Sequence, residues 1–141
     1  MQLAEKGRFA PPPTLPPFAQ AVAEELAALS DVHPRTHWLL GDETQVDGAD
    51  FYVGVRELGH IHLEGEAHIA VSRTLRDRLV SAKLAKPFRW SEGFVVVSIR
   101  SSRTARRASA IFRLAYDQLR GASEPSLVAR VDALGAGEAG D

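Results

Sequence analysis

Histidines alternate with aliphatic residues in one short stretch of this chain, and that alternation constrains the fold more than any other feature. Three of the five histidines, His60, His62 and His68, fall within nine residues. Side chains two residues apart on a β-strand point to the same side of the sheet. Strands here must therefore carry an aliphatic face and an imidazole face, which is typical of a sheet covered on one side only.

The pattern of apolar residues along the chain predicts both helices and strands. Helical spacing recurs in four segments, which are residues 17–30, 74–83, 104–120 and a last short one at 126–134. Strands are predicted at residues 38–40, 51–56, 60–63, 67–71 and 94–100. Strands clustered as hairpins, with helices between and after them, indicate a single α+β domain. We expect an antiparallel sheet of about five strands with helices packed on one face.

The two ends of the chain differ from the rest in composition. Residues 1–16 include a run of three prolines and a fourth at Pro16, which predicts a flexible proline-rich arm because proline fixes φ and lacks an amide donor. Residues 135–141 contain only glycine, alanine and acidic residues and predict a disordered tail. The predicted domain therefore spans residues 17–134.

Composition argues against several classes of function. A formal net charge of -1 gives no bulk attraction to nucleic acid or to an anionic membrane. The chain has no cysteine, which excludes a disulfide, a thiol nucleophile and a thiolate zinc site. No apolar run approaches the roughly 18 to 20 residues that span a bilayer, and the first residues lack an apolar signal core. We expect a cytoplasmic protein.

Two hairpin registers are open between the second and third predicted strands. A two-residue loop at Leu58 and Gly59 would pair Glu57 with His60. A three-residue loop that also includes Glu57 would instead pair Arg56 with His60. The three-residue loop is favoured, because it places the glycine at a left-handed position and aligns the aliphatic residues of both strands.

In the favoured register the two faces of the hairpins separate by polarity. The aliphatic face, which the helices cover, carries Val53, Val55, Ile61, Leu63, Ile69 and Val71. The other face carries Tyr52, Gly54, Arg56, His60, His62, His68 and Ala70. Because Gly54 has no side chain, we expect a polar concavity in the middle of this second face.

Three motifs follow one another along the chain: R-E-L-G-H-I-H at residues 56–62, R-T-L-R-D-R-L-V-S-A at 73–82 and I-F-R-L-A-Y at 111–116. Together they resemble a bacterial family of luciferase-domain proteins whose function is otherwise unknown. The resemblance covers about residues 50–120 and implies little about mechanism. His60 and His62 match the family motif, whereas the family commonly has a small or acidic residue where this chain has His68.

The leading hypothesis for function is a small-molecule or anion site on the imidazole face. Arg56 can fork onto a carboxylate or phosphate, and neutral histidine can donate or accept a hydrogen bond. The predicted ligand-binding residues are therefore Arg56, His60, His62 and Tyr52, in a luciferase-domain-like protein whose catalytic activity the sequence leaves open.

Two alternatives stay open at this point. In the first, His60, His62 and His68 hold a divalent metal such as zinc, and Glu57 acts as the base of a metal-dependent enzyme. In the second, the uncovered sheet face forms a homodimer without catalysis, favoured by an apolar fringe from Phe94 and Val96.

Overall fold

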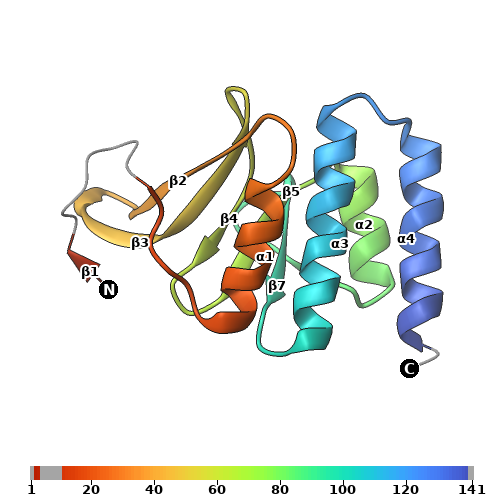
Figure 1. Ribbon diagram of the computed structural model, residues 1–141. Helices are drawn as coiled ribbons and strands as arrows, with labels where there is room; N and C mark the ends of the chain where they lie inside the picture. Colours follow the sequence, from red (N-terminus) through yellow and green to blue (C-terminus); the bar gives the residue numbers. More distant parts are fainter. Residues whose placement is uncertain (1, 4–10, 140–141) are drawn as a thin grey trace.

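The computed structural model describes residues 2–3 and 11–139, which form a twisted antiparallel sheet with helices against it (Figure 1). The strands are β1 (Gln2–Leu3), β2 (Val32–Leu39), β3 (Asp42–Val53), β4 (Arg56–His62), β5 (Glu66–Ala70), β6 (Lys86–Pro87) and β7 (Phe94–Ser98). The helices are α1 (Pro17–Ala27), α2 (Arg73–Ser81), α3 (Ser102–Leu119) and α4 (Glu124–Ala139). The sheet runs in the order β1-β3-β4-β5-β7-β6, and β2 also pairs with β3.

The predicted fold class is confirmed. The chain forms a single α+β domain with an antiparallel sheet, and five of its described strands have five residues or more. The other two, β1 and β6, have two residues each. Strands this short carry too little hydrophobic pattern to be predicted from sequence.

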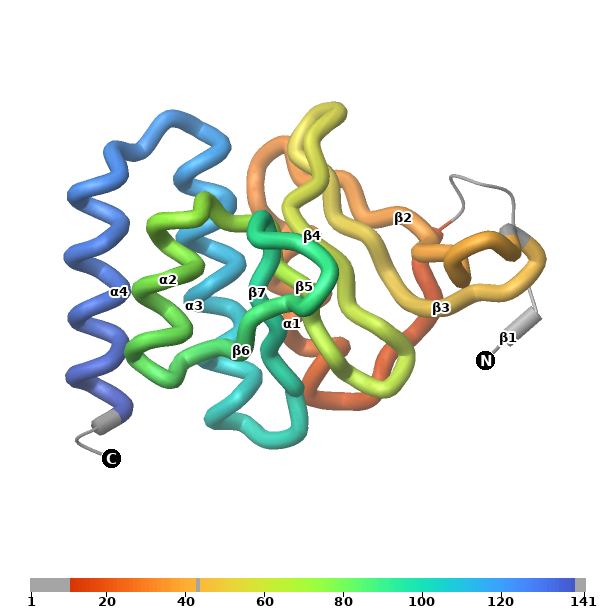
Figure 2. The backbone as a smooth tube through the Cα atoms, turned by 180° about the vertical axis from the view of Figure 1, so that it is seen from behind, coloured from red at the N-terminus to blue at the C-terminus, as the bar shows by residue number. Residues whose placement is uncertain are grey.

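The helices lie on one side of the sheet, as predicted. Helix α3 packs against β4, β5 and β7, while α1 packs against α3 and the β2–β3 hairpin. Helix α2 contacts β6 and β7, and α4 stands outermost against α2 and α3 (Figure 1). The view from behind shows β3 and β4 with no helix in front of them (Figure 2). Among the described residues no helix is long and apolar enough to cross a membrane.

The core lies between the sheet and α3, and strand alternation supplies it. Ile61 and Ile69 are fully buried on the helix-facing side. The histidines next to them in sequence, His60, His62 and His68, face the other way. Phe51 of β3 meets Phe112 of α3 edge to face, with ring centroids 6.2 Å apart. Each of these aromatic side chains contributes a large apolar area to the core, which fixes α3 across the middle strands.

The predicted hairpin register between β3 and β4 is wrong. The turn lies at Gly54 and Val55, and Val53 pairs with Arg56, so Val55 is 92% exposed instead of facing the core. Gly54 takes the left-handed conformation that a two-residue turn needs, with φ of 62°. Leu58, predicted in the loop, is fully buried within β4.

The predicted register between β4 and β5 is wrong by two residues. His60, not His62, pairs with His68, and Ile61 pairs with Ala67. A shift of two residues leaves every side chain on its predicted face, because side chains alternate with a period of two. The separation into a histidine face and an aliphatic face therefore survives this error.

Several element boundaries differ from prediction for local reasons. Helix α1 ends at Ala27, three residues before its predicted end, and Phe18 is 45% exposed because Ala19 and Val22 take the buried positions. Helix α2 begins at Arg73, one residue before its predicted start, because the hydroxyl of Ser72 caps it by accepting a hydrogen bond from the Leu75 amide.

Helix α4 continues through residues 135–139, which were predicted to begin a disordered tail. Arg107 of α3 holds Glu138 near the helix end, with Nε 2.8 Å from Oε2 and 3.0 Å from Oε1, and Nη2 also bonds Oε1. Such a two-pronged ion pair ties the last turn of α4 to α3. Residues 140–141, and residues 1 and 4–10 of the predicted arm, lie outside the described residues.

The Arg107–Glu138 pair predicts a pH dependence of stability. The hydrogen bond from Arg107 lowers the pKa of Glu138 from its ordinary value of 4.5, so the folded state favours the carboxylate. The stabilisation is fully present above pH 4.5 and disappears as the pH falls through the lowered pKa. We expect Glu138→Gln to lower the free energy of unfolding by at most about 1 kcal/mol at pH 7. In urea titrations from pH 7 to 3 the difference from wild type should shrink; a constant difference would contradict this origin.

Candidate functional site

Four of the five histidines meet on the sheet face that the helices leave open. His37 comes from β2, His60 and His62 from β4, and His68 from β5. The ring of His60 is stacked on that of His37 with centroids 4.2 Å apart, and it lies 5.0 Å from His62 and 4.8 Å from His68. Their side chains are only 10% to 21% exposed, so this histidine cluster is largely buried, with a small part of each side chain at the surface.

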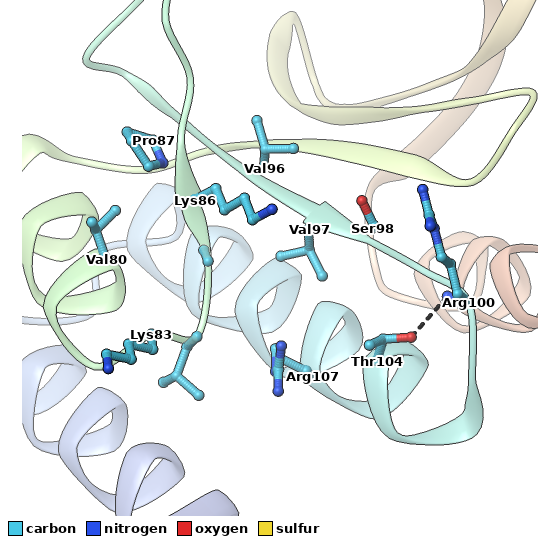
Figure 3. Close-up of a pocket in the computed structure, with 12 residues that line it drawn as sticks. Val80, Lys83, Lys86, Pro87, Val96, Val97, Ser98, Arg100, Thr104 and Arg107 are labelled. Carbon is cyan, nitrogen blue, oxygen red and sulfur yellow. Dashed lines mark hydrogen bonds between the residues drawn. The ribbon is translucent and has the colours of Figure 1, made fainter.

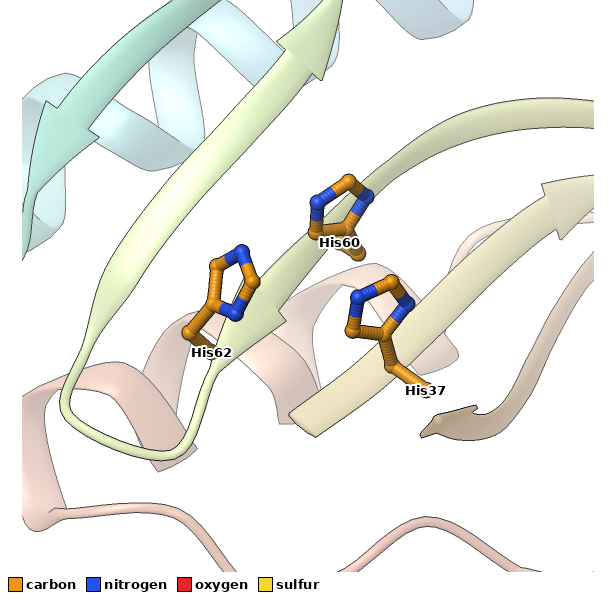
Figure 4. Close-up of side chains that lie close together, drawn as sticks. All are labelled: His37, His60 and His62. Carbon is orange, nitrogen blue, oxygen red and sulfur yellow. The ribbon is translucent and has the colours of Figure 1, made fainter. Parts of the chain in front are cut away.

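A glycine in the strand between them lets His37 and His62 meet. Gly48 of β3 pairs with His37 on one side and with His62 on the other. Any larger residue there would place a Cβ 2.9 Å from the His62 Cα, and closer still to the carbonyl oxygen of Ile61. With no side chain between them, the two imidazoles approach across β3 to a centroid distance of 5.2 Å (Figure 4). The predicted gap at Gly54 is wrong, because Gly54 lies in the β3–β4 turn, and the glycine within this face is Gly48.

Each of three histidines is held through its Nδ1 by a carboxylate. Asp50 Oδ1 lies 2.6 Å from His37 Nδ1, Asp47 Oδ2 lies 2.9 Å from His62 Nδ1, and Glu57 Oε1 lies 3.2 Å from His60 Nδ1. A carboxylate can only accept here, so Nδ1 carries the proton in each ring. In the neutral ring Nε2 then carries the lone pair. In His60 this Nε2 faces Nδ1 of His68 at 3.1 Å.

A β-bulge brings Glu57 to the same face as His60, although the two are three residues apart. Phe51 pairs with Gly59 and Tyr52 with Glu57, so Leu58 is the extra residue on β4. The bulge resets the alternation, with Leu58 buried in the core and Glu57 turned toward His60. The same bulge explains why a regular two-residue period misplaced the start of β4.

His68 completes the histidine cluster but is bound differently. Its Nε2 lies 2.7 Å from Glu66 Oε1, and its Nδ1 lies 3.1 Å from Nε2 of His60. Its carboxylate therefore lies at Nε2 and not at Nδ1, and its Nδ1 is the nitrogen that faces His60. Two rings also border the site, since the Phe88 centroid lies 4.8 Å from that of His68 and Phe94 lies 6.3 Å from His60.

The electrostatic environment differs between the two sides of the cluster. At His37 burial lowers the pKa, but the hydrogen bond to Asp50 and the charges of Asp50, Asp47 and Glu57 outweigh burial and raise it. At His68 burial lowers the pKa, and repulsion from His60 and His62 lowers it further against the opposing effect of Glu66. A positive charge is therefore favoured on the His37 side.

Two overlapping groups of side chains in the described part of the chain have metal-ligand geometry. His37, His60 and His62 offer ligand atoms within 4.8 Å of one another, and so do Asp50, Glu57 and His60. The ligand nitrogens of a tetrahedral zinc site lie roughly 3.3 Å apart, given Zn–N bonds of about 2.0–2.1 Å. The three imidazoles would have to close from within 4.8 Å to that spacing around an ion. This cluster can therefore hold a metal.

The structure brings together some of the residues that the sequence predicted for the site. His60, His62 and His68 lie together, as described above. Tyr52 pairs with Glu57 at the border of the cluster. The Arg35 guanidinium lies 4.6 Å from the centroid of the Tyr52 ring.

Arg56 stands apart from the histidines. It is exposed at the β3–β4 turn, four residues or roughly 13 Å along β4 from His60.

Three residues of the site were not predicted from the sequence: His37, Asp47 and Asp50. All three fall in β2 and β3, most of which had been predicted as loop. One signal was present, because His33, Arg35 and His37 alternate with Pro34 and Thr36 at strand spacing. Proline at the second of these positions hides the strand, since it is uncommon in sheets away from an edge.

One of the comparisons with known proteins found a match. Residues 55–115 match the family model described as Luciferase domain. No curated protein and no solved structure that was compared matches the chain. The matched segment contains β4, β5, α2, β7 and most of α3, and with them His60, His62 and His68. The resemblance to luciferase-domain proteins that the three sequence motifs predicted is therefore confirmed over residues 55–115.

Proposed function

We propose that the open face of the sheet binds one divalent transition-metal ion, zinc in the first place, through His37, His60 and His62. The observation that carries this proposal is the set of three Nδ1–carboxylate hydrogen bonds. Metal-binding histidines characteristically donate their other ring nitrogen to a carboxylate, which fixes the tautomer and makes the metal-facing nitrogen more basic. Three neighbouring histidines with this arrangement offer three Nε2 atoms to one ion.

The charge of the surroundings also favours a cation. Four carboxylates, from Asp47, Asp50, Glu57 and Glu66, contact the histidine cluster. An anion bound directly to these histidines would be repelled by all four carboxylates. Arg56 stands too far along β4 to offset their negative charge. The geometry thus supports a metal in place of the anion site that the sequence analysis favoured.

Three nitrogen ligands leave one position of a tetrahedral zinc site for water or a small ligand. That ligand count is characteristic of catalytic zinc sites, whereas structural sites use four protein ligands. Glu57, considered above as a general base, instead orients His60 through its Nδ1. His68 and Glu66 stand beside the ligands, where they can contact whatever occupies the open position.

The test is a metal titration of protein that is purified without a histidine tag and stripped with a chelator. We expect wild type to bind one equivalent of Zn²⁺ in competition with a chromophoric chelator, and one equivalent of Co²⁺ with a tetrahedral visible spectrum. His60→Ala should lose this binding, because His60 belongs to the ligand set.

The matched control is His33→Ala, which removes an exposed histidine from the same strand as His37. It should bind metal like wild type. Absence of stoichiometric metal binding in wild type would refute the proposal, and so would equal losses in His33→Ala and His60→Ala when circular dichroism shows both variants folded.

A further inference from the structure

A cavity of about 620 Å³ lies at the opposite edge of the sheet and is lined by residues from α2, β6, β7, α3 and the segments between them (Figure 3). Its floor is apolar, with Leu84 and Val97 buried and Val80 and Val96 half-buried. The volume falls within the range of small-molecule sites, roughly 300–1,000 Å³. None of the residues that line it belongs to the histidine cluster or its carboxylates.

The rim of this cavity is strongly basic. Lys83, Lys86, Arg100 and Arg107 line it, and no acidic residue does. Arg107 is neutralised by Glu138, as described above. Lys83, Lys86 and Arg100 form no ion pair with any residue that the structure describes. Three uncompensated cations around an apolar floor create a local positive potential in a chain whose net charge is -1.

The backbone at one end of the rim is held in an unusual conformation. Lys83 has φ of 60°, in the left-handed region that costs a residue with a side chain roughly 1–2 kcal/mol. Hydrogen bonds from the Lys83 amide to Val80 and from the Leu84 amide to Leu79 fix this turn after α2. The turn therefore places Lys83 beside a preformed apolar floor, and Figure 3 shows Lys83 and Arg100 at opposite ends of the cavity.

We propose that this cavity binds an amphiphilic anion, which consists of an apolar chain and a carboxylate or phosphate head. A purely polar anion would leave Val80, Leu84 and Val97 in contact with water. An uncharged apolar molecule would cover the floor but leave the surrounding cations without a counter-charge. Only a molecule with both parts satisfies the floor and the rim together.

The experiment uses chelator-stripped protein and short soluble probes, so that its result does not depend on metal. Octanoate and octyl phosphate are titrated by calorimetry. Octanol, which lacks the charged head, and inorganic phosphate, which lacks the apolar chain, are the matched controls. We expect one equivalent of each amphiphile to bind with a sub-millimolar Kd, at least tenfold more tightly than either control. The stronger of the two amphiphiles identifies the head group.

Variants then separate the rim from the floor. Lys86→Gln and Arg100→Gln should each weaken amphiphile binding at least fivefold, and Val80→Glu should abolish it by placing a carboxylate against the floor. Arg106→Gln, which removes an exposed arginine outside this cavity, should leave binding unchanged. Absence of binding to wild type, equal binding of octanol, or equal losses in Arg106→Gln and Lys86→Gln would each overturn the proposal.

Discussion

Replacing His37 with alanine is expected to weaken zinc binding by about 100-fold or more, whereas His68→Ala should change it less than tenfold. A four-coordinate zinc site contributes roughly 10–16 kcal/mol, so one ligand accounts for about 3 kcal/mol, or two decades in Kd. His37 belongs to the three-histidine group and is fixed through its Nδ1 by Asp50. His68 stands outside this group, and its carboxylate partner, Glu66, holds its Nε2 instead of its Nδ1.

The measurement is the zinc affinity of the two variants by competition with a chromophoric chelator. The comparison separates two ligand sets, because the sequence analysis assigned the metal to His60, His62 and His68. A larger loss in His68→Ala than in His37→Ala would favour the earlier set, and equal losses would favour a four-histidine site. Both substitutions remove one largely buried imidazole from the same face, so each serves as the structural control for the other.

Alternation alone was sufficient to bring His60, His62 and His68 to one face. A register shift of two residues leaves every side chain on the same face of the sheet, so the error between β4 and β5 did not change which residues share a face. The helices were equally predictable, because α1, α2 and α3 each repeat apolar residues at helical spacing over at least two turns.

His37 and its carboxylates were not predictable in the same way. Residues 42–50 contain Asp, Glu and Gly at positions where strands usually have β-branched or aromatic residues. Their strand conformation comes from pairing with β2 and β4, that is, from partners distant in sequence. Gly48 in particular is disfavoured in a strand by intrinsic preference, yet its missing side chain is what allows His37 and His62 to meet.

Gly59 shows how a glycine can mislead a prediction from sequence. Glycine next to a polar residue suggests a turn, and the predicted hairpin loop depended on that reading. In the structure Gly59 lies within β4, paired with Phe51 on one side and Ile69 on the other. A Cβ there would come 2.8 Å from Cε1 of Phe112, 3.1 Å from the Ile69 Cα and closer still to the carbonyl oxygen of His68. The glycine is needed for close packing of α3 on the sheet.

We therefore expect Gly59→Ala to lower the free energy of unfolding by about 3 kcal/mol or more, because two of its three obstacles are backbone atoms of β5 that cannot turn away. Gly54→Ala is the matched control. Gly54 has φ of 62° but no heavy atom within 4 Å of the added Cβ, so only the conformational cost of roughly 1–2 kcal/mol applies. Urea unfolding of both variants measures the difference. If Gly59→Ala lowers the free energy of unfolding no more than Gly54→Ala does, then α3 and β5 do not pack against β4 as closely as the structure shows. His60 and His68 pair across the same two strands, so that result would also remove the basis for the histidine cluster.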